Sequence, residues 1–131
     1  MSVESAKHVG GLAYDIKLPE FLIRVDVKEK QGGANSAPDP HDYLEAALAG
    51  CTAITVQMYA NRKGIPLESV DVKISITKEG KEGNEITREV KFKGNLTEEQ
   101  KTMLLAIAEK CPIHHFLVRG ANIRTTQMVE S

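Results

Sequence analysis

The sequence predicts one small domain that contains both β-strands and α-helices. Its 131 residues suit a single domain over 1–131, and 41% of them are hydrophobic, which is enough for a core. Some segments alternate apolar and polar residues with the period of a strand, and others carry helix-capping signals. Charged residues make up 27% of the chain, a balance typical of globular proteins rather than disordered ones.

Strands are expected near the start of the chain. Residues 11–27 contain strand patterns that are interrupted at Pro19, and a loop rich in glycine and proline follows over 31–40. This loop lacks the lysine and the spacing of a phosphate-binding loop. We therefore expect no nucleotide and no other resident cofactor.

Two further strands are expected in the second half of the chain. Residues 70–76 alternate apolar and polar side chains, and a second strand over 86–92 follows a polar turn. Arg88 falls on the apolar face of that second strand. One interpretation is that its guanidinium reaches the sheet edge or pairs with a carboxylate, and the other is that it is a buried cation that serves an active site. Residues 121–129 are expected to close the chain as a final strand.

A long helix is predicted to begin at Asp39 and to end before Gly64. Asp39 suits the N-cap, Pro40 suits the first helical position, and Asp42 can complete a capping box. The helix is apolar nearly all the way round, which indicates that it is covered on most sides. Because a small two-layer domain covers only one face, this pattern predicts a homodimer.

Two shorter helices should follow the strand pair. Thr97 and Gln100 form a capping-box pattern ahead of an amphipathic run. Cys111 and Pro112 interrupt that run, and proline at a first helical position places Cys111 at the N-terminus of a new short helix.

The charge and the hydropathy of the chain exclude several classes of partner. The net charge of −1 gives no general attraction to nucleic acid. No apolar run approaches the roughly 20 residues that span a bilayer, so no membrane partner is expected. The N-terminal segment lacks the apolar core of a signal peptide, and we expect a cytoplasmic protein.

The two cysteines, Cys51 and Cys111, admit three interpretations: inert buried thiols, a metal site or redox chemistry. Their number alone favours inert thiols. The backbone N–H groups and dipole at the start of a helix would favour a thiolate at Cys111. Cys51 lies within an apolar helix, so it needs a nearby cation to become a nucleophile. Arg24 and Arg88, from the same chain or a partner, are the candidates.

Two segments together resemble the OsmC/Ohr superfamily of thiol peroxidases. They are DPHDYLEAALAGCTAITVQMYANRKG and EKCPIHHFLVRG, separated by a strand pair and a capped helix. The resemblance implies an α+β fold in which two chains form an intertwined homodimer. Antiparallel sheets would wrap around central helices, and the active sites would lie at the subunit interface.

The resemblance also assigns roles to the cysteines. Cys51 would be the peroxidatic thiol that attacks a peroxide and becomes a sulfenic acid. Cys111 would be the resolving thiol that condenses with it to a disulfide. The implied substrates are organic hydroperoxides and in some cases hydrogen peroxide. The implied reductant is a lipoyl-type dithiol or a small thiol.

The chain departs from the family pattern at His41. Members that reduce organic hydroperoxides carry a glutamate ten positions before the first cysteine, and here that position is His41. A neutral histidine can accept a hydrogen bond or assist proton transfer, and the alternative is a solvent-facing residue of the first helical turn. Arg24 best matches the place of the catalytic arginine of the family.

Two other functions compete with a peroxidase. One is a non-catalytic dimer that senses redox state or binds an apolar ligand. The other is a zinc-binding module, in which Cys51, Cys111 and one of His114 or His115, with His41, would supply the ligands. Since the peroxidase needs no metal, no metal site is expected.

Overall fold

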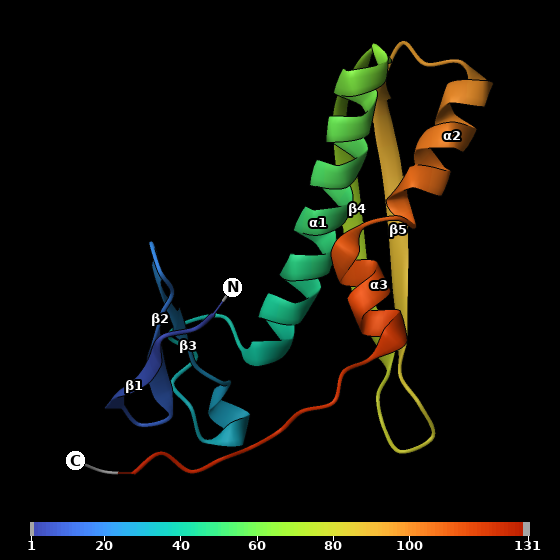
Figure 1. The fold of residues 1–131 in the computed structure, drawn as a ribbon. Helices are drawn as coiled ribbons and strands as arrows, with labels where there is room; N and C mark the ends of the chain where they lie inside the picture. The colour runs from blue at the N-terminus through green and yellow to red at the C-terminus, as the bar shows by residue number, and fades with distance from the viewer. Residues whose placement is uncertain (1, 130–131) are drawn as a thin grey trace. The chain divides into compact units, whose positions relative to one another are not determined.

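The computed structural model describes residues 2–129 and has an α+β fold, which confirms the predicted class. Its elements are β1 (Ser5–Gly10), β2 (Ala13–Lys17), β3 (Leu22–Val25), the 3-10 helix η1 (Glu29–Gln31), α1 (Pro40–Lys63), β4 (Leu67–Lys78), β5 (Glu85–Gly94), α2 (Glu98–Ala108) and α3 (Pro112–Arg119) (Figure 1). The chain divides into two compact units, one up to Ala47 and one from Leu48 onward. The single domain over 1–131 stays a prediction.

The first unit is built on an antiparallel sheet in the order β1-β2-β3. Strands β2 and β3 lie within the predicted strand segment and flank the turn at Pro19, where the Leu18 N–H bonds the Phe21 carbonyl at 2.8 Å. Strand β1 was not predicted. All six of its residues are exposed, so it has no apolar alternation, and its pairing with β2 holds it in place.

A buried carboxylate organises the loop after β3. Asp26 is 1% exposed and accepts four hydrogen bonds, from the N–H groups of Val27, Ala34 and Ser36 and from the Ser36 hydroxyl, at 2.6–3.3 Å. The bonds from Ser36, followed by the one from Val27, lower the pKa of Asp26 to about 2. A Cβ at Gly33 would lie 2.1 Å from the Val27 carbonyl oxygen, so the closed loop admits only glycine there.

Acid should destabilise the fold through Asp26. Its pKa is about 2 in the folded chain against an ordinary 3.8, so the unfolded chain binds more protons between these values. The stabilisation is complete above about pH 4 and is lost as the pH falls through about 2. We expect Asp26→Asn to lower the thermal midpoint at pH 7 by several degrees and to flatten its acid dependence, measured by circular dichroism.

The matched control for this change is Glu20→Gln, which alters an exposed carboxylate of the same unit. It should keep the wild-type midpoint and acid slope. An Asp26→Asn protein that also kept both would contradict the role given to Asp26.

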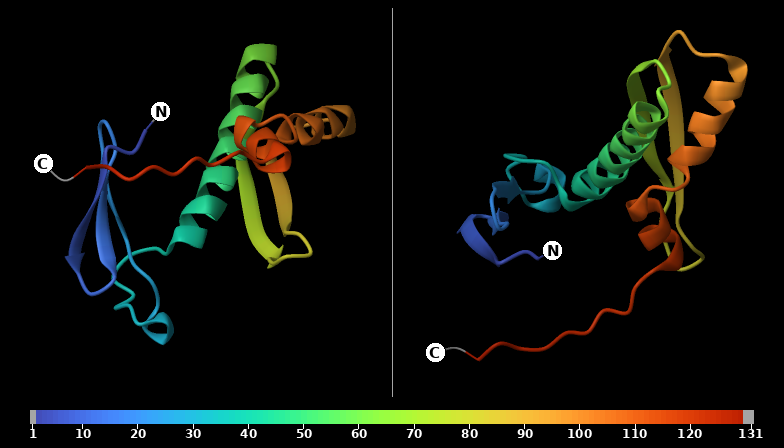
Figure 2. Two further views of the ribbon diagram at one scale, coloured as in Figure 1. Left: turned by 60° about the horizontal axis from the view of Figure 1, so that its bottom comes forward. Right: turned by 45° about the horizontal axis from the view of Figure 1, so that its top comes forward.

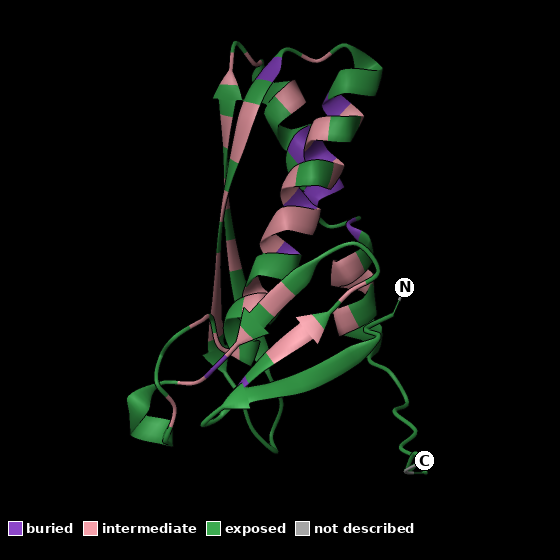
Figure 3. Cartoon of the chain, turned by 90° about the vertical axis from the view of Figure 1, so that its left-hand side faces the viewer, coloured by how far each residue is buried: buried purple, intermediate pink, exposed green. Residues whose placement is uncertain are grey.

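The second unit packs the later part of α1, together with α2, against one face of the β4–β5 hairpin (Figure 2). On that face Val72 pairs with Val90 across the two strands, and Arg88 pairs with Ile74. Helix α2 begins with the predicted capping box of Thr97 and Gln100. The buried core consists of Val56, Ala60, Leu67, Leu104, Ile107 and Ala108 (Figure 3).

Helix α1 has the predicted ends. The Asp39 carboxylate accepts from the Asp42 N–H at 2.9 Å, and the Asp42 carboxylate accepts from the Asp39 N–H at 3.0 Å. Pro40 is the first helical residue, and Gly64, with φ of +69°, follows the last. The helix is therefore started and stopped by local interactions that its own sequence encodes.

Within this chain, α1 is covered along one stripe only. Its buried residues are Leu48, Thr52, Val56 and Ala60, each one turn after the last. Ile54 and Met58 are 61% and 62% exposed, although both are apolar. Cover on most sides of the helix would need a second chain, and the homodimer stays a prediction.

The predicted final strand over 121–129 is wrong. These residues form neither helix nor strand, and Ile123 and Met128 are about nine-tenths exposed, at 89% and 91%. A strand exists only where a neighbour completes its ladder of hydrogen bonds, and within the described residues this segment joins neither sheet. Across residues 2–129, every helix is too short or too polar to cross a bilayer.

Candidate functional site

Cys111 is the N-cap of α3, and its sequence setting predicted this place at the start of the helix. Its side chain is fully buried, and Pro112 occupies the first turn of the helix. The sulfur accepts a hydrogen bond from the backbone N–H of His114 at 3.2 Å. The thiol therefore takes the capping position that serine or aspartate usually fills.

Cys51 lies half-buried on α1 and interacts with Cys111. Both thiols are free. Burial raises the pKa of the Cys51 thiol, and the hydrogen bond and charge of Cys111 raise it further. The Ile113 N–H and the Thr55 side chain oppose this rise by bonding the sulfur. Among the described residues no cation contributes to the pKa of Cys51, so within this chain the thiol is the favoured form.

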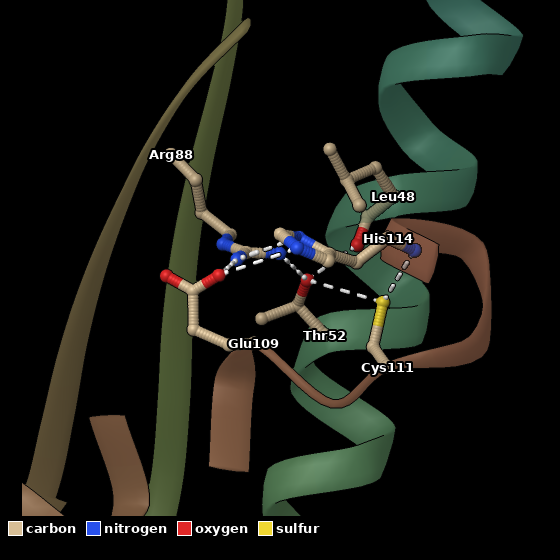
Figure 4. A network of polar contacts seen from close by, with 6 residues as sticks. All are labelled: Leu48, Thr52, Arg88, Glu109, Cys111 and His114. Atoms are coloured by element: carbon tan, nitrogen blue, oxygen red, sulfur yellow. Dashed lines mark hydrogen bonds and ion pairs between the residues drawn. The ribbon is translucent and has the colours of Figure 1, made fainter. Parts of the chain in front are cut away.

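A largely covered arginine connects three elements beside Cys111 (Figure 4). Arg88 projects from β5 with its side chain 11% exposed. Its Nη1 donates to the Thr52 hydroxyl at 3.2 Å, and its Nη2 lies 3.1 Å from His114 Nδ1. The same Nη2 pairs with the Glu109 carboxylate at 3.3 Å, and this carboxylate also lies 3.3 Å from His114 Nε2. We call Arg88, Thr52, Glu109 and His114 the Arg88 network.

The Arg88 network reaches the Cys111 sulfur from two directions. The Thr52 hydroxyl oxygen lies 3.9 Å from that sulfur and 2.7 Å from the Leu48 carbonyl oxygen. The His114 backbone N–H provides the second contact. Two of the residues held by Arg88 therefore also hold Cys111.

A cavity of about 470 Å³ adjoins this network. Arg88, Glu109 and His114 face it on one side. Its other lining residues are Leu48, Asn84, Ile86, Leu117 and Val118. Small polar solutes that enter this space can reach the guanidinium and the imidazole next to Cys111.

The structure places Arg24 and His41 in the first unit. Arg24 forms a two-pronged pair with Asp15 across β2 and β3, at 2.7 and 3.3 Å, and its side chain is 49% exposed. This pair lowers the pKa of Asp15 and raises that of Arg24. His41 is exposed in the first turn of α1. Their catalytic roles stay predictions.

Thr52 and Glu109 were not predicted as functional residues. Arg88 was the only signal, because a cation on an apolar strand face needs partners. Arg88 pairs with the Glu109 carboxylate, as one alternative proposed, and its largely covered side chain bonds Thr52 beside Cys111, while its service to an active site stays a prediction. His114 was considered above as a candidate zinc ligand, and in the structure its backbone N–H bonds the Cys111 sulfur.

Among the described residues, the structure does not group the side chains that the zinc hypothesis requires. Within residues 2–129, no three or more histidine, cysteine, aspartate or glutamate side chains are grouped so that they could hold a metal ion. The two cysteines therefore lack the further ligands that a closed zinc site requires.

The two thiols should differ in their reaction with a maleimide. Cys111 is fully buried and Cys51 is only half-buried. An opening free energy of only about 1.4 kcal/mol would slow labelling of Cys111 about tenfold relative to Cys51. Time-resolved labelling of reduced Cys51→Ser and Cys111→Ser variants, followed by mass spectrometry, measures this ratio. The difference should disappear in urea, and equal labelling rates in the folded protein would contradict the burial of Cys111.

Three comparisons relate the chain to known proteins. A family model described as OsmC-like protein matches residues 32–126. A comparison with curated proteins found no significant match. Among solved structures, a protein of Psychrobacter arcticus 273-4, named for osmotic stress induction and a detoxification response, has a TM-score of 0.72 at 17% identity, and the alignment covers 88% of this chain and 87% of that one.

Two other solved structures share the fold. An organic hydroperoxide resistance protein OsmC of Legionella pneumophila has a TM-score of 0.64 at 24% identity, with 88% of each chain covered. An organic hydroperoxide resistance protein of Elizabethkingia anophelis has a TM-score of 0.63 at 20% identity, with 91% of each chain covered. At these identities the likeness concerns the fold.

Proposed function

The chain belongs to the OsmC-like family, and we propose that it is a cysteine-based peroxidase that reduces organic hydroperoxides. The observation that carries the proposal is the contact between two free thiols, Cys51 on α1 and Cys111 at the start of α3. The names of the Legionella and Elizabethkingia proteins support the choice of organic hydroperoxides. Hydrogen peroxide is a second substrate of the same chemistry.

In the proposed first step, the Cys51 thiolate attacks the terminal oxygen of the hydroperoxide. A sulfur–oxygen bond forms and the oxygen–oxygen bond breaks, so the sulfur is oxidised to a sulfenic acid. The peroxide is reduced, and its alkoxide takes up a proton to leave as an alcohol. Cys51 suits this role because it is the more accessible of the two thiols.

In the second step, the Cys111 sulfur attacks the oxidised sulfur of Cys51. A sulfur–sulfur bond forms, the sulfur–oxygen bond breaks, and the hydroxide leaves with the Cys111 proton as water. A dithiol reductant, of the lipoyl type or a small thiol, then opens the disulfide through a mixed disulfide and leaves oxidised. Because each cycle ends in reduction, the proposal places the protein in a reducing compartment such as the cytoplasm.

The first step needs a cation beside Cys51. Within the chain, burial raises the pKa of Cys51, whereas attack on a peroxide needs the thiolate. We propose that Arg24 supplies this charge in the assembled protein, with His41 as an acceptor or proton carrier. Arg24→Met should then shift the pH profile of peroxide reduction to higher pH.

The central test is turnover. Wild-type protein should consume cumene hydroperoxide or tert-butyl hydroperoxide in the presence of dihydrolipoamide or dithiothreitol. Cys51→Ser should reduce turnover to background, because the one remaining thiol, Cys111, is fully buried. Cys111→Ser should consume about one equivalent of peroxide and then depend on direct reduction of the sulfenic acid. Turnover that survives Cys51→Ser would contradict the mechanism.

A second candidate function is a non-catalytic dimer that senses redox state or binds an apolar ligand. The raised pKa of Cys51 favours it, since a protonated thiol reacts slowly with peroxide. Saturable binding of a fatty acid without peroxide turnover would support this function over the peroxidase.

We further propose that the functional protein is a homodimer whose interface includes the exposed side of α1. On an ideal helix Met58 lies about 20° and Ile54 about 60° from Cys51. Both side chains are more than half exposed. A partner that covered them would remove apolar surface from water and would bring its own charged residues close to Cys51.

The dimer can be tested by light scattering coupled to gel filtration. The wild-type mass should be twice the chain mass of 14.4 kDa. Ile54→Glu and Met58→Glu should shift it toward the monomer, because each would bury a charge in the proposed interface. Lys81→Glu, at an exposed position in the turn between β4 and β5, is the control and should stay dimeric. A monomeric wild-type protein would contradict the proposal.

A further inference from the structure

The contacts of Thr52 define which way its hydroxyl proton points. A hydroxyl carries one proton and two lone pairs, whereas a guanidinium only donates. Arg88 therefore donates to the Thr52 oxygen, and the single proton can bond either the Leu48 carbonyl or the Cys111 sulfur. At 2.7 Å against 3.9 Å, the carbonyl is its partner in this state. When Cys111 becomes a thiolate, the proton can turn to the sulfur while Arg88 still holds the oxygen.

The contacts of His114 define its proton positions as well. Its Nδ1 faces a guanidinium, which has no acceptor, so Nδ1 must accept. Its Nε2 faces the Glu109 carboxylate, which only accepts, so Nε2 is the nitrogen that carries a hydrogen toward it. Arg88 and Glu109 together fix the ring of the residue whose backbone N–H bonds the Cys111 sulfur.

We propose that Arg88 is a positioning residue for the resolving thiol, which it holds in place through Thr52 and His114. This inference rests on the proposed function, since it concerns the second step of that reaction. Arg88 bonds the Thr52 hydroxyl, which lies beside the sulfur, and the imidazole of His114, whose backbone N–H bonds the sulfur. These contacts keep the Cys111 sulfur positioned for attack on the oxidised sulfur of Cys51. Without them, the sulfur could move together with the first turn of α3.

The Arg88 guanidinium, whose side chain is 11% exposed, is a charge that is expensive to bury for packing alone. An apolar residue of similar size at position 88 would pack beside Ile86 and Val90 on the same face of β5. It would do so without the cost of removing a guanidinium from water. A planar group with several donors, in contrast, can bond a hydroxyl, an imidazole and a carboxylate at once. Lysine has one small charged group and cannot span the same three partners.

The test separates the two steps of oxidation. Arg88→Met, Arg88→Lys and wild-type protein are mixed with cumene hydroperoxide, and Cys51 sulfenic acid is trapped with dimedone and quantified by mass spectrometry. In the Arg88 variants sulfenic acid should form within about twofold of the wild-type rate, whereas the disulfide should form at least tenfold more slowly. Lys91→Met, on the exposed face of the same strand, is the control and should match the wild type.

A second oxidant keeps this inference separate from peroxidase activity. Diamide forms an adduct with one thiol, and the second thiol then displaces its hydrazine to give the disulfide. Disulfide closure with diamide should show the same loss in the Arg88 variants, whether or not the protein reduces peroxides. If the wild-type protein does not react with peroxides but forms the disulfide rapidly with diamide, the proposed function is refuted. The role of Arg88 in disulfide closure is then still tested by the diamide rates of the variants.

Two results would overturn the role of Arg88. One is closure in Arg88→Met and Arg88→Lys as fast as in Lys91→Met. The other is an equal loss in both steps, which would assign Arg88 to Cys51 or to general stability. Circular dichroism checks the fold of each variant, and if Arg88→Met does not fold, Arg88→Lys decides the outcome alone.

Discussion

The packing of the Cys111 sulfur against α1 is the contact on which the chemistry of the second unit depends. The sulfur caps α3 through the His114 N–H and lies beside the Thr52 hydroxyl, so it connects two helices that are far apart in sequence. Strand β5 adds Arg88, which binds the residues on both sides of the sulfur. A thiol in this position is protected from solvent and yet in contact with the half-exposed Cys51.

The two thiols therefore have different environments and suit different steps. The polar contacts of the Cys111 sulfur, with the His114 N–H and the Thr52 hydroxyl, are all made within one chain. The pKa of Cys51, in contrast, is raised by burial, and the described residues of the chain bring this thiol no cation. Beside it α1 exposes Ile54 and Met58, the kind of surface that a partner chain covers. The homodimer proposed above would account for both features, since a partner chain would cover this face of α1 and bring charged residues close to Cys51.

Local signals made part of this structure predictable from sequence. Capping rules were sufficient to place the starts of three helices, at Asp39, Thr97 and Cys111. Each start depends on interactions within four consecutive residues. The Arg88 network was not predictable, because it joins three elements whose packing no local pattern specifies. The strand predicted after Gly120 did not form. Its residues favour a strand locally, but strand formation also needs a neighbouring strand.

The central claim, that Cys51 and Cys111 act as one redox pair, is tested most directly by the product of a single oxidation. Reduced protein is treated with one equivalent of an organic hydroperoxide, quenched in acid and digested without reduction. Mass spectrometry should find the peptides of Cys51 and Cys111 joined within one chain, with the total mass lowered by two hydrogens. Recovery of a stable Cys51 sulfinic acid beside an unmodified Cys111 would contradict the account.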